Sequence, residues 1–179
     1  MGSPTAAFAF LVETLFHLYL VVLLLRLLLE MIRADFYNPV VQLLLKATDP
    51  LVKPLARVIP PVGRVNLAGV LLLYLIQLLS LFLLALITGV QVDPLLLALV
   101  AFLRLVRMLL VLYLVLIIAG VILSWVGQGF RHPIVPLIFQ LTDPVLAPIR
   151  RVLPPLGGFD LSPLIALIGI QFLIILLGV

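Results

Sequence analysis

Long apolar segments alternate along this chain with shorter segments in which prolines and charged residues recur. The apolar segments cover about residues 6–32, 66–87, 104–125 and 160–179. A helix of about 20 apolar residues crosses roughly 30 Å of hydrocarbon, so each segment predicts a membrane-spanning helix. The segments 38–61 and 132–155 combine cations and prolines with an apolar stripe. This pattern favours a hairpin of two short amphipathic helices, either interfacial or re-entrant.

The two proline-rich segments are copies of one motif. The first copy contains Asn38-Pro39, Thr48-Asp49-Pro50, Arg57, Pro60-Pro61 and Gly63. The second copy contains His132-Pro133, Thr142-Asp143-Pro144, Arg151, Pro154-Pro155 and Gly157. Every match keeps the offset that separates Thr142 from Thr48, which indicates an internal duplication with repeats 1–93 and 94–179. We therefore predict an all-α membrane protein of two repeats, each with a proline-rich hairpin between two spans.

Two spans in each repeat give both repeats the same orientation in the membrane. Such parallel repeats are related by a pseudo-two-fold axis along the membrane normal. Cations cluster beside the proline-rich segments, at Arg33, Lys46, Lys53, Arg57, Arg64, Arg131, Arg150 and Arg151. Only Arg104 and Arg107 are available for the opposite side. The positive-inside rule then predicts cytoplasmic proline-rich segments and two external termini.

Composition supports the membrane class and argues against several functions. The chain is 65% hydrophobic and 10% charged, whereas soluble domains are about half apolar and about a quarter charged. The net charge of +4 lies beside apolar spans, which favours lipid headgroups over nucleic acid as the anionic partner. The sequence contains no cysteine, no nucleophile–base set and no metal-ligand cluster. We therefore expect neither an enzyme nor a catalytic, metal or cofactor site.

The repeated Asp49 and Asp143 are the first candidate site residues. They could form a cation-binding pair near the axis, or they could cap short helices before their prolines, which is the interpretation we favour. Arg57 and Arg151 follow them by eight residues in each copy. Each arginine could pair with the aspartate of its own copy or bind lipid phosphate, and the internal pair is favoured.

Charges inside the spans form a second group of candidates. Arg26 lies within the first span, where an i,i+4 pair with Glu30 could neutralise it. The alternative for Arg26 is snorkelling towards cytoplasmic headgroups. Glu13 corresponds to Arg107 by the repeat offset, so the two residues lie at equal depth and could bridge spans one and three.

Two glutamines and two histidines complete the candidates. Gln77 and Gln171 match by the repeat offset, and an amide in hydrocarbon needs a partner. They could bond between spans two and four or line a pore. His17 could act as a proton relay or haem ligand, but a hydrogen-bonded packing role is the stronger expectation. His132 corresponds to the helix cap Asn38.

The duplicated Thr-Asp-Pro, Arg, Pro-Pro and Gly pattern, followed by Asp160-Leu161-Ser162-Pro163, resembles the YggT family of small integral membrane proteins. The first copy departs from it, with Asn66-Leu67-Ala68-Gly69 at the position of that tetrapeptide. The resemblance implies a bacterial inner-membrane protein with relatives in plastids. It also implies links to osmotic-stress tolerance, to cell or plastid division, and to haem attachment in some plastid members. It makes Asp160 and Ser162 candidate site residues.

Three function hypotheses follow. The first is a structural or assembly factor that acts through lipids, through membrane or cytoplasmic proteins and through further copies of itself. The second is an oligomeric channel or transporter whose path is lined by Arg26, Gln77, Gln171 and the two aspartates. The third is haem handling through His17 or His132. Convergence of the polar residues on a water-filled space would favour transport, and pairing within a dry core would oppose it.

Overall fold

Six α-helices make up the part of the chain that the structure, a computed structural model, describes: residues 4–126, 132–153 and 160–178. The helices are α1 (Pro4–Met31), α2 (Pro39–Ala56), α3 (Leu67–Thr88), α4 (Pro94–Val126), α5 (Ile134–Val152) and α6 (Ser162–Leu177). The motif residues Pro154, Pro155 and Gly157, and the predicted cytoplasmic cation Arg131, lie outside the described residues.

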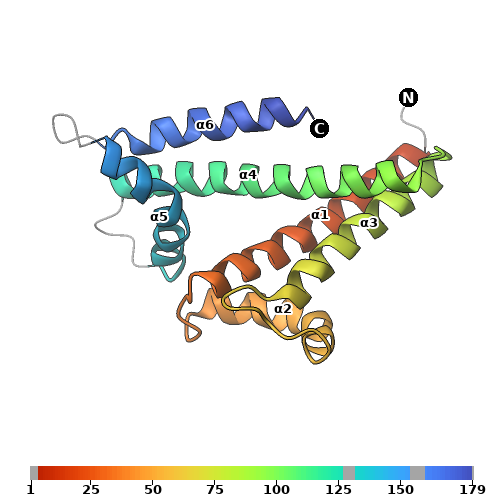
Figure 1. The fold of residues 1–179 in the computed structure, drawn as a ribbon, viewed down its shortest axis with the longest axis horizontal. Coiled ribbons are helices and arrows are strands. Elements are labelled where there is room, and N and C mark those ends of the chain that lie inside the picture. Colours follow the sequence, from red (N-terminus) through yellow and green to blue (C-terminus); the bar gives the residue numbers. More distant parts are fainter. Residues whose placement is uncertain (1–3, 127–131, 154–159, 179) are drawn as a thin grey trace.

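Each repeat folds as two apolar helices with an amphipathic helix between them in sequence. In the first repeat α1 packs on α3 and α2 contacts both, while in the second repeat α4 packs on α6 and α5 contacts both. In Figure 1, α1 and α4 run in one direction, whereas α3 and α6 return in the other. The first turn of α1 and the last turn of α6 lie away from α2 and α5 (Figure 1). Both repeats therefore point the same way.

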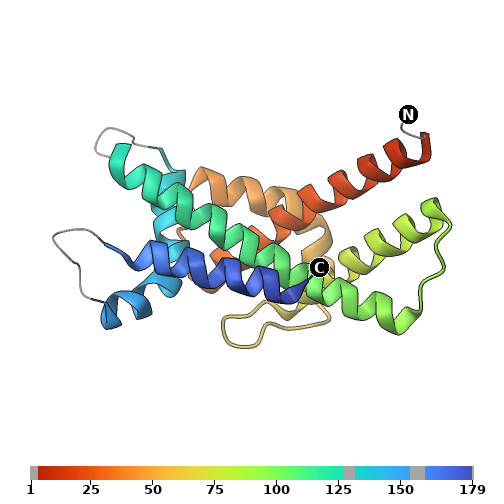
Figure 2. The same ribbon diagram turned by 90° about the horizontal axis from the view of Figure 1, so that it is seen from above.

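Contacts between the repeats do not keep the predicted two-fold symmetry. Helix α4 packs on α3 of the first repeat as well as on α6 of its own (Figures 1 and 2). The symmetry-related contact, between α6 and α1, has no comparable extent in the described chain. The beginnings of α2 and α5 do meet, because the Asn38 side-chain amide donates to the Pro133 carbonyl oxygen at 2.7 Å.

Three helices, α1, α3 and α4, are long and apolar enough to cross a membrane. Helix α6 is as apolar but has 16 residues, or about 24 Å at 1.5 Å per residue. The hydrocarbon layer is about 30 Å thick. The structure thus supports a helical membrane protein and leaves the predicted count of four spans unconfirmed.

The predicted hairpins are wrong, because α2 and α5 are each one continuous helix. Pro50 and Pro54 lie inside α2, and Pro144 and Pro148 lie inside α5. A proline within a helix removes one backbone donor and frees one carbonyl. All four prolines are on the exposed face, where water can satisfy the freed carbonyls, while the opposite face is buried. Burial of that apolar face therefore keeps the helix continuous through the prolines.

Helix beginnings follow the sequence closely. Asn38 caps α2 by accepting from the Val40 N–H at 2.9 Å, and Asn66 caps α3 by accepting from the Gly69 N–H at 3.0 Å. Asp93 accepts from the first N–H groups of α4, and Asp160 accepts from the Ser162 N–H at 2.9 Å. Each cap satisfies a backbone donor that the helix itself leaves free.

Close approach of α1 and α3 depends on Gly69. A Cβ at this position would overlap the Leu27 Cδ2 atom, and Leu27 is part of the main buried cluster. In the second repeat Gly120 of α4 faces α5, where an added Cβ would contact Ile138 at 3.7 Å and Phe139 at 3.9 Å. These are ordinary contact distances, so a glycine is required for the close helix approach at Gly69 and not at Gly120.

Gly69→Leu should lower the thermal stability of the purified protein in detergent. An overpacked contact typically costs about 1–3 kcal/mol, which corresponds to a fall in Tm of a few degrees for a chain of this size. Gly169→Leu is the matched control, since a Cβ on this α6 glycine would meet nothing within 4 Å. Equal Tm values for the two variants would contradict close packing of α1 on α3.

Candidate functional site

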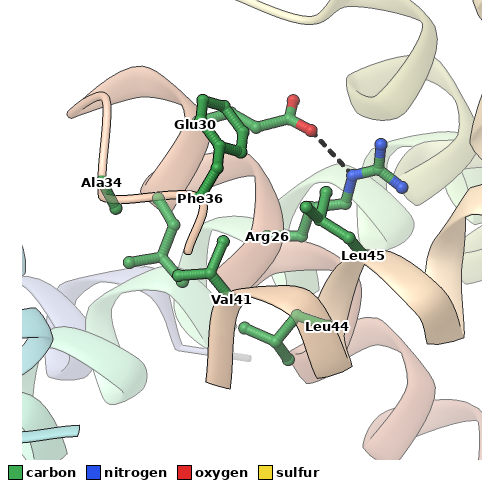
Figure 3. Close-up of a pocket in the computed structure, with 8 residues that line it drawn as sticks. Arg26, Glu30, Ala34, Phe36, Val41, Leu44 and Leu45 are labelled. Atoms are coloured by element: carbon green, nitrogen blue, oxygen red, sulfur yellow. Dashed lines mark hydrogen bonds and ion pairs between the residues drawn. The ribbon is translucent and has the colours of Figure 1, made fainter. Parts of the chain in front are cut away.

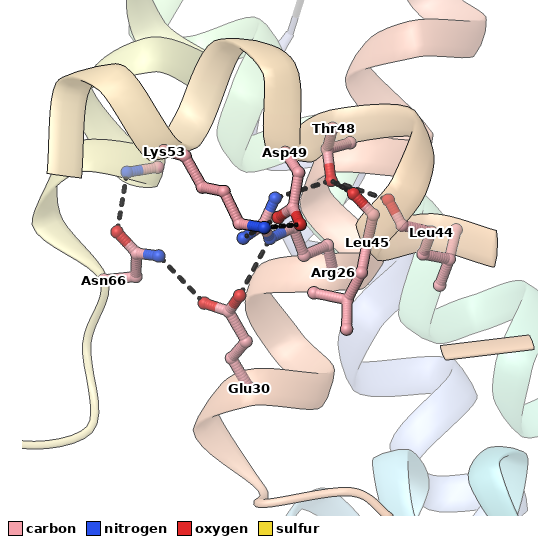
Figure 4. A network of polar contacts seen from close by, with 9 residues as sticks. Arg26, Glu30, Leu44, Leu45, Thr48, Asp49, Lys53 and Asn66 are labelled. Atoms are coloured by element: carbon pink, nitrogen blue, oxygen red, sulfur yellow. Dashed lines mark hydrogen bonds and ion pairs between the residues drawn. The ribbon is translucent and has the colours of Figure 1, made fainter. Parts of the chain in front are cut away.

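Arg26 lies on the buried face of α1 and is the centre of a network that joins three helices. Its side chain is only 7% exposed. Its Nε donates to Glu30 Oε1 at 2.8 Å, and its Nη1 donates to Thr48 Oγ1 at 2.8 Å. Its Nη2 lies 2.9 Å from Asp49 Oδ1 (Figure 4). This last contact is an ion pair without hydrogen-bond geometry.

The acids around Arg26 connect it to α2 and α3. Asp49 Oδ2 pairs with Lys53 Nζ at 2.7 Å, and Glu30 Oε2 accepts from Asn66 Nδ2 at 3.0 Å (Figure 4). The Asn66 side chain is also the cap of α3. Two cations and two carboxylates make the group formally neutral, as a buried charge cluster must be to avoid a large desolvation cost. The network therefore ties α1, α2 and α3 together.

Thr48 shows how the local fold of α2 serves this network. Its hydroxyl is fully buried, donates to the Leu44 carbonyl oxygen at 2.6 Å and accepts from Arg26. A hydroxyl can fill both roles because it has one donor and two acceptor lone pairs. A hydroxyl that bonds to a carbonyl of the preceding turn also favours a bend in the helix. Thr48 therefore favours a bend in α2 and supplies a hydrogen-bond acceptor for Arg26.

The space beside Arg26 is nearly filled. Figure 3 shows the small cavity between the end of α1 and the start of α2, which Glu30, Phe36, Val41 and Leu44 help to line. Its volume is about 10 Å³, enough for about one water molecule. Arg26 thus forms the i,i+4 pair with Glu30 that the spacing indicates, and it does not snorkel to the surface.

Among the residues of the second repeat that the structure describes, no equivalent of this network is formed. The position of Arg26 is occupied by Gly120, which contacts α5 through apolar groups. Asp143 is largely exposed and pairs with Arg150 Nη1 at 3.3 Å. Arg150 Nε also pairs with Asp160 Oδ2 at 2.8 Å, which ties the end of α5 to the beginning of α6. Asp49 and Asp143 therefore belong to separate ion-pair groups rather than to one symmetric site.

The structure contradicts the favoured roles of the repeated acids and arginines, the helix caps and the pairs within each copy. Asp49 and Asp143 lie inside α2 and α5 and do not cap a helix, because those helices continue through the prolines. Asp49 pairs with Lys53 rather than with Arg57, and Asp143 pairs with Arg150 rather than with Arg151. Arg57 and Arg151 are exposed.

Helix geometry explains the change of partners. In a continuous helix a residue eight positions on is rotated by about 80° and is more than two turns away. Residues at i+4 and i+7 are rotated by only about 40° and 20°. Lys53 and Arg150 occupy these positions relative to their aspartates.

A second group of polar residues lies between α1, α3 and α4, towards the end of the molecule away from α2 and α5 (Figure 1). Glu13 pairs with Arg104 at 3.0 Å, one turn before the predicted partner Arg107. Arg107, His17, Gln77 and Ser80 lie around the same cavity. Its volume is about 590 Å³. This space brings His17 and Gln77, which the sequence pattern treated separately, together with the predicted pair Glu13 and Arg107.

The remaining candidates lie apart from this cavity. Gln171 is exposed on α6, and within the described residues no hydrogen bond joins it to Gln77. His132 Nδ1 accepts from the Ile134 N–H at 3.3 Å, but His132 precedes the N-cap residue Pro133, whereas Asn38 is itself the N-cap of α2. Ser162 is fully buried at the start of α6. Arg26, Gln77, Gln171 and the two aspartates therefore do not line one common space within the described part of this single chain.

Arg26→Gln should destabilise the protein strongly, because it leaves Glu30 and Asp49 without their buried cation. Removing one partner of a buried pair costs about 3–5 kcal/mol, which predicts a Tm about 10 °C lower in detergent. Lys53→Gln is the matched control: Lys53 is 70% exposed, and an exposed pair contributes at most about 1 kcal/mol.

A compensated variant separates charge from packing. Arg26→Met combined with Glu30→Gln and Asp49→Asn leaves no buried charge, so it should recover most of the stability lost by Arg26→Gln. If Arg26→Gln cost no more than Lys53→Gln, the network would not hold the first repeat together.

The ion pair between Arg150 and Asp160, which links α5 to α6, should be lost in strong acid. Burial raises the pKa of the Asp160 carboxyl, but contacts with Ser162 and Arg150 outweigh it, so the pKa lies below its usual 3.8. Such a group stabilises the fold above pH 3.8, and the effect is lost as pH falls through the lowered pKa. The difference in Tm between the natural protein and Asp160→Asn should therefore be constant near neutrality and shrink in strong acid. A difference that persisted well below pH 3.8 would contradict this linkage.

Known proteins match this amino-acid sequence over nearly the whole chain. The profile of the CCB3/YggT family matches residues 5–87 and 99–179, one match in each repeat. A Vibrio alginolyticus protein described as "Uncharacterized protein in proC 3'region" is 46% identical, over 95% of this chain and 92% of its own length.

Two further relatives have similar coverage. "Uncharacterized protein PA0392" of Pseudomonas aeruginosa is 38% identical, over 97% of this chain and 88% of its own length. "Uncharacterized protein YggT" of Escherichia coli K12 is 40% identical, over 87% of this chain and 81% of its own length. No solved structure matches the chain. On the family profile and these relatives, the chain belongs to the CCB3/YggT family.

Proposed function

We propose that this chain is a structural or assembly factor of the bacterial inner membrane that acts through lipid and protein contacts. The observation that carries the proposal is the closely packed, formally neutral network around Arg26. It uses the intramembrane charges of the first repeat to hold helices together and leaves the outer face of α2 free for contact. Because this network uses its charges to hold α1, α2 and α3 together, the exposed surface of α2 is the part of this region that can contact lipids and other proteins.

The outer face of α2 is basic and well suited to anionic headgroups. Lys46, Lys53 and Arg57 follow one another along this face with Pro50 and Pro54 between them, and they line a shallow surface groove of about 420 Å³. Lys and Arg near a membrane surface each contribute about 1 kcal/mol of attraction to anionic lipid. The ion pair between Lys53 and Asp49 reduces the charge of the groove without removing it.

We propose four spans with α2 and α5 on the cytoplasmic side. Helix α6 is short but apolar throughout and pairs with α4, and a bilayer can thin by a few Å around a short span. The cations near α2 include Arg33 and Arg64 as well as those of the groove. Their excess over the opposite side favours cytoplasmic placement by the positive-inside rule.

Transport is the second candidate, and the cavity between α1, α3 and α4 is the observation that favours it. It has polar walls within the membrane-spanning helices. Flux of ions and small solutes into liposomes that contain the purified protein would test this function. Flux that changes with His17→Ala or Arg107→Gln would locate a path through the cavity and replace the structural role proposed above. If none of a broad panel of ions and small solutes entered the liposomes, the transport function would be rejected and the structural role would stand.

The lipid contact of α2 can be tested by exchanging its cations. Changing Lys46, Lys53 and Arg57 together to Gln should remove most of the preference of the protein for phosphatidylglycerol over phosphatidylcholine. The preference can be measured by spin-labelled lipids in mixed vesicles. Raising the salt concentration should weaken the preference of the natural protein, because headgroup attraction is screened.

The matched control keeps the charge and changes the residues: Lys46→Arg, Lys53→Arg and Arg57→Lys. This variant should retain the preference. If the Gln variant bound phosphatidylglycerol as well as the natural protein does, α2 would not be the lipid-contacting surface, and protein partners alone would remain for it.

A further inference from the structure

The cavity between α1, α3 and α4 is polar at one end and apolar at the other. On α1 the polar lining residues Glu13 and His17 precede the apolar Leu20, and on α4 Arg107 precedes Val111 and Val115. Because α1 and α4 run in the same direction (Figure 1), the polar residues of both helices lie towards the end away from α2 and α5. The apolar residues lie towards the middle of the molecule.

Two polar side chains of α3 face this cavity without a partner. Gln77 is 6% exposed and Ser80 is 4% exposed, and both line the space. Neither makes a hydrogen bond within the described residues, although the fold surrounds both of them almost completely. A buried amide or hydroxyl without a hydrogen-bond partner destabilises the folded protein. The cavity therefore contains hydrogen-bonding groups that an occupant could satisfy.

The charge at the polar end favours an anion. Arg104 and Arg107 oppose one carboxylate, Glu13, so these three side chains sum to +1. Arg104 contacts Glu13 through Nη1 alone, and a guanidinium has five N–H donors in total. Arginine binds carboxylate and phosphate through paired donors, so donors remain at this end for an anionic head group.

The apolar end requires a hydrocarbon partner. Leu20, Val111 and Val115 lie on this part of the wall together with Met108 and Leu112. The whole volume, about 590 Å³, is within the range of about 300–1,000 Å³ for small-molecule sites. An ion alone would leave this half empty, and a hydrocarbon alone would leave the amide and hydroxyl of α3 unsatisfied.

We propose that this cavity binds an acyl-chain amphiphile whose anionic head, a carboxylate or a phosphate, contacts Arg107, Gln77 and Ser80. The chain of the amphiphile extends along Val111 and Val115. Both a free fatty acid and a phospholipid have this chemistry. The site is separate from the basic face of α2, which contacts head groups at the opposite end of the molecule.

The test uses the full-length protein in nanodiscs of phosphatidylcholine, which has no net charge. The probe is dansyl-labelled undecanoic acid, and its methyl ester is the uncharged match. We expect the acid to bind saturably and the ester to bind at least several-fold more weakly. Inorganic phosphate alone should not displace the acid. Competition with oleic acid and with lysophosphatidylglycerol then identifies which source of the head group binds more tightly.

Two variants place the site. Arg107→Gln should weaken binding of the acid about tenfold, the effect of one charge-assisted hydrogen bond, and leave the ester unchanged. Val111→Trp should fill the apolar end and abolish binding of both. Ile122→Trp is the matched control, because Ile122 is an exposed residue of the same helix outside the cavity lining.

Several results would overturn the proposal. Equal binding of acid and ester would show a lipid-filled groove without head-group recognition, and displacement by phosphate alone would show an anion site without a chain. Undiminished binding in Val111→Trp, with helix content and Tm unchanged, would place the probe elsewhere. Cross-linking of two copies through the cavity wall, with no probe binding, would make it an interface.

Discussion

A guanidinium inside an apolar helix must be neutralised, and this requirement at Arg26 determines how the first repeat is assembled. Helix α1 itself supplies one carboxylate, Glu30, and α2 has to supply the other carboxylate and a hydroxyl at defined positions, which fixes the rotation of α2 about its axis and its position along α1. Glu30 carries the constraint on to the cap of α3. The apolar contacts of the same helices, such as Leu27 against Gly69, are compatible with this one arrangement. In hydrocarbon, where apolar contacts alone distinguish poorly between registers, a polar network of this kind provides specificity.

The two repeats attach their amphipathic helices by different physical means. In the first repeat the contact between α1 and α2 is charged and centred on Arg26. In the second repeat the contact between α4 and α5 is apolar and close, with Gly120 facing Ile138 and Phe139. The exposed Asp143 is then free to join Arg150 and, through it, Asp160 of the α6 start. Similar sequence motifs therefore support similar folds with different polar interactions.

Much of the fold could be predicted from the sequence because it depends on local patterns. The lengths of the apolar segments predicted the long helices. The internal duplication, with two spans in each repeat, predicted that both repeats have the same orientation. Asn38, Asn66, Asp93 and Asp160 marked helix beginnings by their own chemistry. Proline was misleading, since its local effect is to break a helix, and only the packed structure shows that all four prolines face outward where the missing donors cost little.

Less of the candidate site could be predicted from the sequence, because contacts between residues far apart in the chain leave no local sequence pattern. The Arg26–Glu30 pair was visible as an i,i+4 spacing, but the contacts of Arg26 with Thr48 and Asp49 depend on how α2 docks. The repeat offset paired Glu13 with Arg107, although the ion pair joins Glu13 to Arg104. It also linked Gln77 with Gln171, because equivalent positions were assumed to have equivalent surroundings. Lys53 and Arg150 could have been found from their i+4 and i+7 spacing to the aspartates if α2 and α5 had been treated as continuous helices.

The glycine that replaces arginine at position 120 makes the two halves of this protein non-interchangeable. An arginine at Gly120 would face Ile138 and Phe139 with Ser124 at the position where the first repeat has Glu30, and a glycine at position 26 would leave Glu30 and Asp49 without their buried cation. A chain built from two first repeats, or from two second repeats, could not simply reproduce this molecule. A symmetric dimer of one half would have this charge network twice or not at all, whereas the described part of this chain has it once.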